Sequence, residues 1–261
     1  MKRVLIEICC GSYEDVVIAE STGADRVELN SAMFLGGLTP TLGCLIEVKT
    51  NTKIPVIAMI RPREAGFYYS DYEYAVMKRD AAMLLEHGAD GLVFGILNEN
   101  STLDEARMSG LIRLCKDAGK TAVCHRAFDV TPDPIAALDT LIELGIDRVL
   151  TSGQQPNVVN GTKLISELIK HAAGRIEILP GAGLEPGNIA DFVEKTGVDQ
   201  VHILASTLRA ETSTAMNPGI YFGGALYPRE DVISIANGDA IGLVSTILKT
   251  CHAVHDPVSR E

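Results

Sequence analysis

Five side chains suited to acid–base chemistry fall near the ends of short apolar segments of this chain, which has 261 residues. They are two carboxylates, two histidines and an arginine: Glu7, Glu28, Arg61, His125 and His202. A glutamate beside an arginine stays ionised, whereas a histidine can titrate near neutral pH, so the set could serve as catalytic acids and bases. Glutamate and histidine are also metal ligands. The same residues could therefore form a metal site, or a polar interior whose charges satisfy one another.

Six cysteines add thiol chemistry, and two of them, Cys9 and Cys10, are adjacent. Adjacent strand residues point to opposite faces, so this pair chelates one ion only if the backbone turns there. Thiolates would select Cu(I) or Zn rather than Mg. The chain has no CxxC motif and no cysteine spacing typical of secreted proteins. This pattern predicts reduced thiols and a cytoplasmic location.

A fourfold repeat indicates which elements position these residues. A glycine, a small or apolar residue, an aspartate and a strand-like run recur from Gly23, Gly88, Gly145 and Gly197. The glycine suits a helix end at positive φ, and the aspartate suits a turn. The copies lie roughly 50 to 65 residues apart, twice the length of one strand–helix unit, so a further strand should separate each pair. Eight strands predict an α/β fold, a single (β/α)8 TIM-type barrel over residues 1–261.

The functional residues of such barrels lie at the carboxyl ends of the strands, here expected at 4–10, 26–30, 55–61, 91–97, 121–128, 148–152, 175–180 and 200–205. The outer faces of the strands pack on apolar helices, so charged strand residues should point inward. Alternation then places Glu7 and Cys9 inside and Cys10 outside. On the fifth strand we expect His125 inside and Arg126 at the rim. The same parity turns four more residues inward: Glu28, Asn30, Arg61 and His202.

A second group of residues predicts binding of a small anionic ligand. Gly181 and Gly183 follow the seventh strand and Ser206 follows the eighth, where such barrels commonly bind phosphate. Arg63 lies in the long 62–69 loop, which could close over a ligand or pack on another subunit of a homo-oligomer. Further candidates are Arg126, Asp129 and Ser152. No lysine falls at an expected strand end, which disfavours a Schiff-base aldolase.

Composition narrows the range of partners. The net charge is −11 and lysine and arginine do not cluster, so neither nucleic acid nor an anionic membrane is an expected partner. No run approaches the ~18 apolar residues of a membrane span. Residues 207–228 form a long excursion before the closing helices, and residues 252–261 should be a loose tail.

Several segments taken together resemble the CutC family of copper homeostasis proteins: residues 7–9, 23–29, 59–63, 69–71, 90–95, 125–129 and 150–153. The resemblance implies a TIM-type barrel, a cytoplasmic location and Cu(I) binding. Copper binding in the family is associated with a first-strand cysteine, matched by Cys9, and a cysteine after the second strand, where this chain has Asn30. Cys10 could substitute for the missing thiol. The family's Gly-Gly-Gly after the seventh strand has Ala182 in the middle here, a mild change if only the outer glycines need special backbone angles.

Two hypotheses of function follow. The resemblance favours a cytoplasmic copper-handling protein that binds Cu(I) through Cys9 and a neighbour. The pattern of residues favours an enzyme that acts on a small anionic, perhaps phosphorylated, metabolite. Glu7 or Glu28 and His125 would be its acid and base, and Arg61 and Arg63 would clamp the anion. A catalytically inactive barrel is a third alternative, and it would need side chains to block the mouth.

Overall fold

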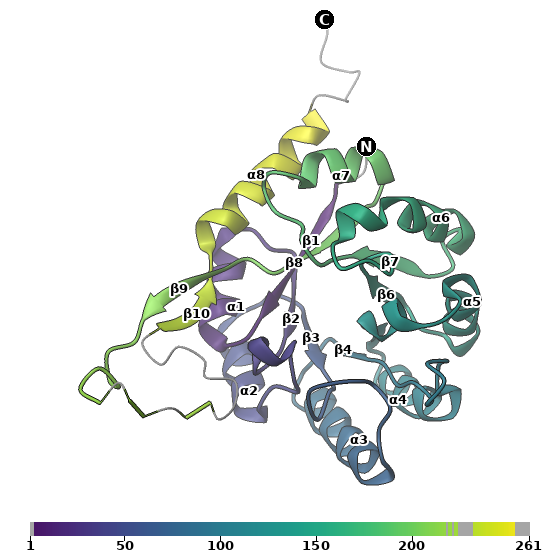
Figure 1. Ribbon diagram of the computed structural model, residues 1–261, viewed down its shortest axis with the longest axis horizontal. Helices are drawn as coiled ribbons and strands as arrows, with labels where there is room; N and C mark the ends of the chain where they lie inside the picture. The colour runs from purple at the N-terminus through teal and green to yellow at the C-terminus, as the bar shows by residue number, and fades with distance from the viewer. Residues whose placement is uncertain (1–2, 218, 221, 224–231, 254–261) are drawn as a thin grey trace, which may run out of the picture.

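The computed structural model describes residues 3–217, 219–220, 222–223 and 232–253. Eight parallel strands lie in the order β7-β6-β5-β4-β3-β2-β1-β8, and a ring of helices surrounds them (Figure 1). The predicted (β/α)8 barrel is therefore confirmed. The strands are β1 Leu5–Cys10, β2 Arg26–Leu29, β3 Val56–Met59, β4 Gly91–Phe94, β5 Thr121–Cys124, β6 Arg148–Thr151, β7 Glu177–Pro180 and β8 Gln200–Ile203.

Eight described α-helices cover the outside of the barrel, and several of them begin at a capping side chain. Ser12 accepts a hydrogen bond from the Asp15 backbone at the start of α1, and Ser70 and Glu73 form a reciprocal capping box at the start of α3. The helices are α1 Tyr13–Thr22, α2 Leu42–Asn51, α3 Asp71–Glu86, α4 Glu105–Asp117, α5 Pro134–Leu144, α6 Thr162–Ala172, α7 Ile189–Thr196 and α8 Gly238–Ala253. Short 3-10 turns are η1 Met33–Leu35, η2 Arg126–Val130 and η3 Val158–Gly161.

The fourfold repeat marks the entries to β2, β4, β6 and β8. Its glycines all have positive φ, as expected: 102° at Gly23, 98° at Gly88, 84° at Gly145 and 69° at Gly197. In three copies the aspartate also accepts a hydrogen bond from the preceding strand: Asp25 from the Ile6 N–H at 2.9 Å, Asp90 from Val56 at 2.9 Å and Asp147 from Ala122 at 2.8 Å. The repeat thus fixes the stagger between neighbouring strands as well as the turn.

The interior of the barrel is divided into two halves. Strands β3, β4 and β5 contribute a small apolar cluster of Ile57, Met59, Val93 and Val123. The other strands contribute charges: Arg26 pairs with Glu7 and donates to Gln200 at 3.0 Å, and Arg148 donates to Glu177 at 2.6 Å. Among the described strand residues that face the interior, the ionisable side chains therefore gather in the charged half.

One boundary between strands is unlike the others. In the described part of the chain no backbone ladder joins β7 to β8, whereas every other neighbouring pair of barrel strands is hydrogen-bonded. The Gln200 side chain crosses this boundary and donates to Glu177 at 3.2 Å. The barrel is therefore closed at this boundary, the β7–β8 seam, by side chains rather than by main chain.

Several strands are shorter than expected. The fifth strand ends at Cys124, and residues 126–130 form η2 instead of extending the strand. The sequence did not reveal two further strands: β9 Ser206–Ala210 lies at the start of the excursion and β10 Val232–Ala236 follows it, and the two pair antiparallel beside α1 (Figure 1). Helix α8 extends through residues 252 and 253 of the expected tail, and residues 254–261 lie outside the described residues. None of the described helices is both long and apolar enough to cross a membrane.

Candidate functional site in the mouth of the barrel

A cavity of about 600 Å³ opens at the carboxyl ends of the strands. Seven of the residues expected to form the site line it: Cys9, Glu28, Arg61, His125, Arg126, Gly183 and His202. Seven others do not belong to its lining: Glu7, Cys10, Arg63, Asp129, Ser152, Gly181 and Ser206. The structure therefore gathers half of the expected residues around one cavity and places the other half outside its lining.

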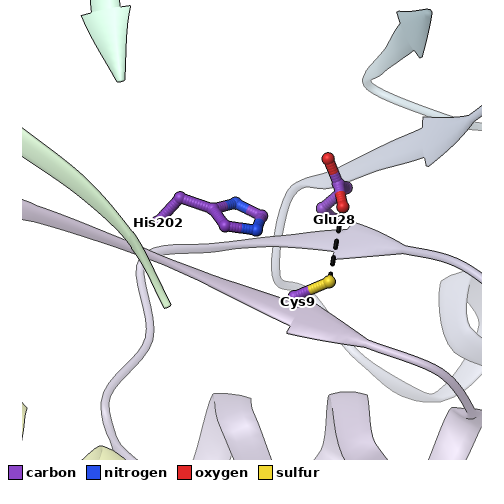
Figure 2. Close-up of side chains that lie close together, drawn as sticks. All are labelled: Cys9, Glu28 and His202. Atoms are coloured by element: carbon purple, nitrogen blue, oxygen red, sulfur yellow. Dashed lines mark hydrogen bonds between the residues drawn. The ribbon is translucent and has the colours of Figure 1, made fainter. Parts of the chain in front are cut away.

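Cys9, Glu28 and His202 form the tightest cluster of functional groups in the cavity. Their ligand atoms all lie within 4.8 Å of one another. Figure 2 shows the three side chains converging from β1, β2 and β8, with the Cys9 thiol donating to Glu28 Oε2 at 3.4 Å. A thiol, a carboxylate and an imidazole at this spacing can bind one metal ion or exchange protons with one small ligand.

Glu7 lies behind this cluster and orients His202. Its Oε1 is 2.8 Å from His202 Nδ1, and Arg26 contacts its other oxygen. Burial on its own raises the pKa of Glu7, but the charges of Arg26 and His202 outweigh it and lower the pKa to about 2. Burial on its own lowers the pKa of His202, but the negative charges of Glu28 and Glu7 outweigh it and raise the pKa above its usual value. Glu7 is thus a permanent anion that fixes the imidazole, with Nε2 left for a ligand.

Glu28 and Cys9 are held closer to their protonated forms. Burial raises the pKa of Glu28, despite the opposing charge of His202. Burial, followed by the negative charge of Glu28, raises the pKa of the Cys9 thiol well above its usual range. A cation entering the cluster would displace these protons, because metal binds to the thiolate and the carboxylate.

The residue at the second family cysteine position, Asn30, contacts Cys9 directly. Its Nδ2 donates to Cys9 Sγ at 3.4 Å and to Glu28 Oε2 at 2.8 Å. The structure does not bring Cys10 to this cluster, since its fully buried side chain packs in the apolar layer between the strands and the helices. The strand stays extended through both residues, so their side chains diverge. Among the described residues, Cys9 is therefore the one thiol that lines the cavity.

His125 directly follows β5 and caps η2. Its Nδ1 accepts a hydrogen bond from the Ala127 N–H at 3.1 Å, and its Nε2 is buried with no partner among the described residues. Burial, followed by the charge of Arg61, lowers the pKa of His125 to about 3. His125 is therefore a neutral imidazole in the physiological range, and it cannot act there as a cationic acid.

The two arginines expected to clamp an anion are engaged with loop carbonyls. Arg61 donates from Nη1 to Leu35 and Gly37 and from Nη2 to Ala65, at 2.9 Å in each case. Arg63 pairs with Glu73 at 2.5 Å and donates to the carbonyl of Tyr68 at 2.7 Å, within its own loop. Arg61 thus joins two loops at the rim, and Arg63 stabilises its loop without reaching the cavity.

Asp129 and Ser152 organise the rim rather than line it. Asp129 accepts hydrogen bonds from the hydroxyl of Thr151 at 2.5 Å and from the backbone of Ser152 at 3.0 and 3.1 Å, and it pairs with Arg126 at 2.7 Å. The Ser152 hydroxyl is itself bonded to Asp129 at 2.9 Å. These bonds hold η2 against the end of β6 and leave Arg126 as the rim residue, as expected.

In the loop after β7, positive φ angles were expected at Gly181 and Gly183, but they occur at residues 182 and 183. Ala182 and Gly183 have φ of 79° and 94°, whereas Gly181 is not among the residues with positive φ. The strained positions are thus the second and third, so the alanine occupies a conformation that favours glycine. Gly181 is needed for another reason, because a Cβ there would lie 2.9 Å from the Leu150 side chain. Ser206 opens β9 and is exposed outside the cavity.

Sequence reasoning missed the apolar part of the lining. Met33, Met59, Phe67, Leu150 and Leu204 all face the cavity. Alternation along β3 could have placed Met59, since it lies two residues after the inward-facing Ile57. No local signal marks Met33, which reaches the mouth from η1 in the loop after β2.

Comparison with known proteins shows which family this chain belongs to. The sequence profile of the CutC family matches residues 4–207. The chain belongs to the CutC family. A CutC family protein of Treponema denticola is 54% identical over 92% of this chain and 96% of its own length. A human copper homeostasis protein cutC homolog is 40% identical over 94% of this chain and 89% of its own length.

Solved structures agree with this fold. A Streptococcus agalactiae protein, described as a candidate copper homeostasis protein CutC, matches with a TM-score of 0.72 and 33% identity over 76% of this chain and 97% of its own. N-(5'-phosphoribosyl)anthranilate isomerase from Pyrococcus furiosus matches with a TM-score of 0.54 and 15% identity over 95% of this chain and 99% of its own. The second likeness shows the barrel fold alone. CutC membership makes this chain a copper homeostasis protein homologue.

Proposed function

We propose that this CutC protein binds Cu(I) in the mouth of its barrel through Cys9 and His202, with Glu28 as a third ligand. The observation that carries the proposal is the convergence of their three ligand atoms within 4.8 Å of one another. The names of the human and mouse relatives, which are copper homeostasis homologs, support copper as the ion. The ion is here a cargo that the protein takes up and releases.

Cys9 and His202 suit a soft cation such as Cu(I), whereas Glu28 suits a harder one. Thiolate and imidazole are ligands that Cu(I) accepts, and the thioethers of Met33 and Met59 line the same cavity. The carboxylate of Glu28 is a harder ligand, which favours Zn²⁺ at this position. Binding to Cys9 must release its thiol proton, so Cu(I) affinity should rise with pH. The five described cysteines are free thiols, which supports the reducing cytoplasm as the location.

A Cu(I) titration against a colorimetric chelator under anaerobic conditions tests this proposal. Cys9→Ala should lower the Cu(I) affinity at least a hundredfold, since the cavity then has no thiol. Cys10→Ala is the matched control and should leave the affinity unchanged, because Cys10 faces the apolar layer. Equal affinities for the wild type and Cys9→Ala would contradict Cu(I) binding here. Zn²⁺ titrated in parallel shows whether Glu28 shifts the preference.

A second candidate function is supported by the size of the cavity. A volume of about 600 Å³ is much larger than one ion needs and falls within the range of small-molecule sites. We infer that the mouth also binds a small organic metabolite, on which Glu28 and His202 would act as acid and base. A thermal-shift panel of sugar phosphates, small organic acids and their amides tests this candidate. A panel in which no compound raises the melting temperature would contradict it.

We further propose that the chain forms a homo-oligomer. The support is the set of apolar side chains that the excursion exposes, which includes Leu208 and Met216. Light scattering coupled to size-exclusion chromatography would test this, and a monomeric mass at micromolar concentration would contradict it.

A further inference from the structure

Two N–H groups in the mouth, Arg61 Nε and His125 Nε2, are buried without an acceptor at normal hydrogen-bond geometry among the described residues, and the buried Tyr69 hydroxyl is the neutral polar group beside Arg61. Both residues line the cavity and are more than nine-tenths buried, with 7% of Arg61 and 4% of His125 exposed. Buried donors are normally satisfied, so an unsatisfied pair in a cavity indicates a missing acceptor. Neither nitrogen is itself exposed to the cavity, so an acceptor atom could reach the pair only after a covering side chain moves.

The hydrogen bonds of each side chain define what these nitrogens can do. The Ala127 N–H donates to His125 Nδ1 at 3.1 Å, so Nδ1 is unprotonated and the ring proton lies on Nε2. The other two nitrogens of Arg61 already donate to the carbonyls of Leu35, Gly37 and Ala65. Each residue therefore offers one N–H in a fixed position, and neither can accept a hydrogen bond there.

The Phe67 ring is close to both donor residues. Its ring centroid is 4.8 Å from that of His125, and the Arg61 guanidinium carbon is 5.5 Å from the same ring. The Phe67 carbonyl accepts a hydrogen bond from the Leu97 N–H at 2.9 Å, which holds the backbone in place. The ring can thus turn away by a change of rotamer while the loop keeps its path.

We propose that Arg61 Nε–H and His125 Nε2–H form a binding site for the carboxylate of a small organic acid, and that the Phe67 ring covers this site until the acid enters. A carboxylate supplies two oxygen acceptors, one for each donor. Its negative charge complements Arg61, whereas His125 contributes no charge. A carboxylate held there shares the cavity with Glu28 and His202, which are the acid–base groups. This inference rests on the second candidate function and names its ligand class.

The tautomer of His125 is tested by nitrogen NMR on protein carrying labelled histidine. His125 should be neutral with its proton on Nε2 from pH 5 to pH 8. His87→Gln helps to assign the spectrum, because His87 is exposed at the end of α3. A proton found on Nδ1, or a charged ring at pH 7, would overturn the proposal.

The ligand class is tested with pyruvate as the probe and pyruvamide as its uncharged counterpart. Pyruvate should shift the His125 Nε2–H resonance saturably, and pyruvamide should bind at least tenfold more weakly. By ligand-observed NMR, Phe67→Ala should bind pyruvate at least threefold more tightly than the wild type, because the cover is removed. His125→Phe should weaken binding at least tenfold, and His125→Gln, which restores an N–H, should recover most of the loss.

The exposed Phe34 provides the matched control, and Phe34→Ala should bind pyruvate like the wild type. The proposal fails if pyruvate gives no saturable shift in either the wild type or Phe67→Ala, or if folded His125→Phe and His125→Gln bind it as the wild type does. A sugar phosphate that binds without shifting His125 would sustain the small-molecule function and overturn this inference. Loss of all small-molecule binding would reject both.

Discussion

Glu7 Oε1 lies 2.8 Å from His202 Nδ1, although 195 positions separate the two residues in the chain. The pair is formed because β1 lies beside β8, with Glu7 in register with His202. It joins the first strand of the barrel to the last, and it sets the direction in which the imidazole faces the cavity.

Glu7→Gln should destabilise the protein by about 3–5 kcal/mol near pH 6, because Arg26 and His202 lose a buried anion. The folded pKa of Glu7 is about 2, below its ordinary value of 4.5, so its contribution is present above pH 4.5 and is lost as the pH falls toward 2. Urea unfolding at a series of pH values measures the difference. Glu177→Gln is the control, since that glutamate is half exposed and should cost less. A deficit that persists undiminished at pH 2 would contradict the assignment.

His125 should make the protein sensitive to acid. Its folded pKa of about 3 lies below the ordinary 6.5, so the unfolded chain binds a proton in this range that the folded protein excludes. The exclusion of this proton should therefore lower the free energy of unfolding by up to about 1.4 kcal/mol per pH unit as the pH drops from 6.5 toward 3. His125→Gln should flatten that part of the urea-derived stability profile. His87→Gln should leave the slope as it is, and an unchanged slope in His125→Gln would show that His125 is accessible to protons.

Asp129→Ala should destabilise the protein by about 3–5 kcal/mol, because it leaves Arg126 unpaired and the Thr151 and Ser152 donors unsatisfied. Asp139→Ala is the control, because Asp139 forms a half-exposed pair with His171 and should cost less than about 1 kcal/mol. Chemical denaturation compares the two. Equal losses would mean that the rim does not depend on Asp129.

Ala182→Gly should stabilise the protein by about 1 kcal/mol, because it relieves an alanine at a φ of 79°. Gly183→Ala should do the opposite, since φ is 94° and the new Cβ would lie 2.3 Å from the Asn157 side chain. The melting temperatures of the two variants should therefore move in opposite directions. A lower melting temperature for Ala182→Gly would show that the alanine Cβ makes contacts worth more than the strain.

The barrel could be predicted from the sequence because its signals are local and repeated. Gly23 and its three counterparts mark helix ends, and period-two alternation turns Glu7, Cys9 and Glu28 toward the axis. The same alternation separated Cys10 from Cys9. Each of these inferences needs only the geometry of one strand or one turn.

What could not be predicted depends on contacts between distant segments. Arg63 and the two terminal nitrogens of Arg61 looked free to bind an anion, because the carbonyls that occupy them come from loops whose path the sequence does not specify. His125 was placed on a strand that ends one residue earlier, and its neutrality depends on the Ala127 N–H and on burial. The second strained position at Ala182 was missed because alanine carries no signal for positive φ.

The β7–β8 seam has a mechanical consequence for the mouth. Strands joined by ladders can separate only by breaking several hydrogen bonds together, whereas this pair can part by breaking side-chain contacts alone. His202 lies on one side of the seam and Gly181 on the other, so close that a Cβ on Gly181 would be 3.1 Å from His202 Cβ. Breathing along this line would change the distance from His202 to the 181–183 loop while Cys9 and Glu28 stay paired through β1 and β2. The aperture of the cavity is therefore adjustable between His202 and the 181–183 loop, whereas His202, Cys9 and Glu28 stay together because ladders join β8, β1 and β2.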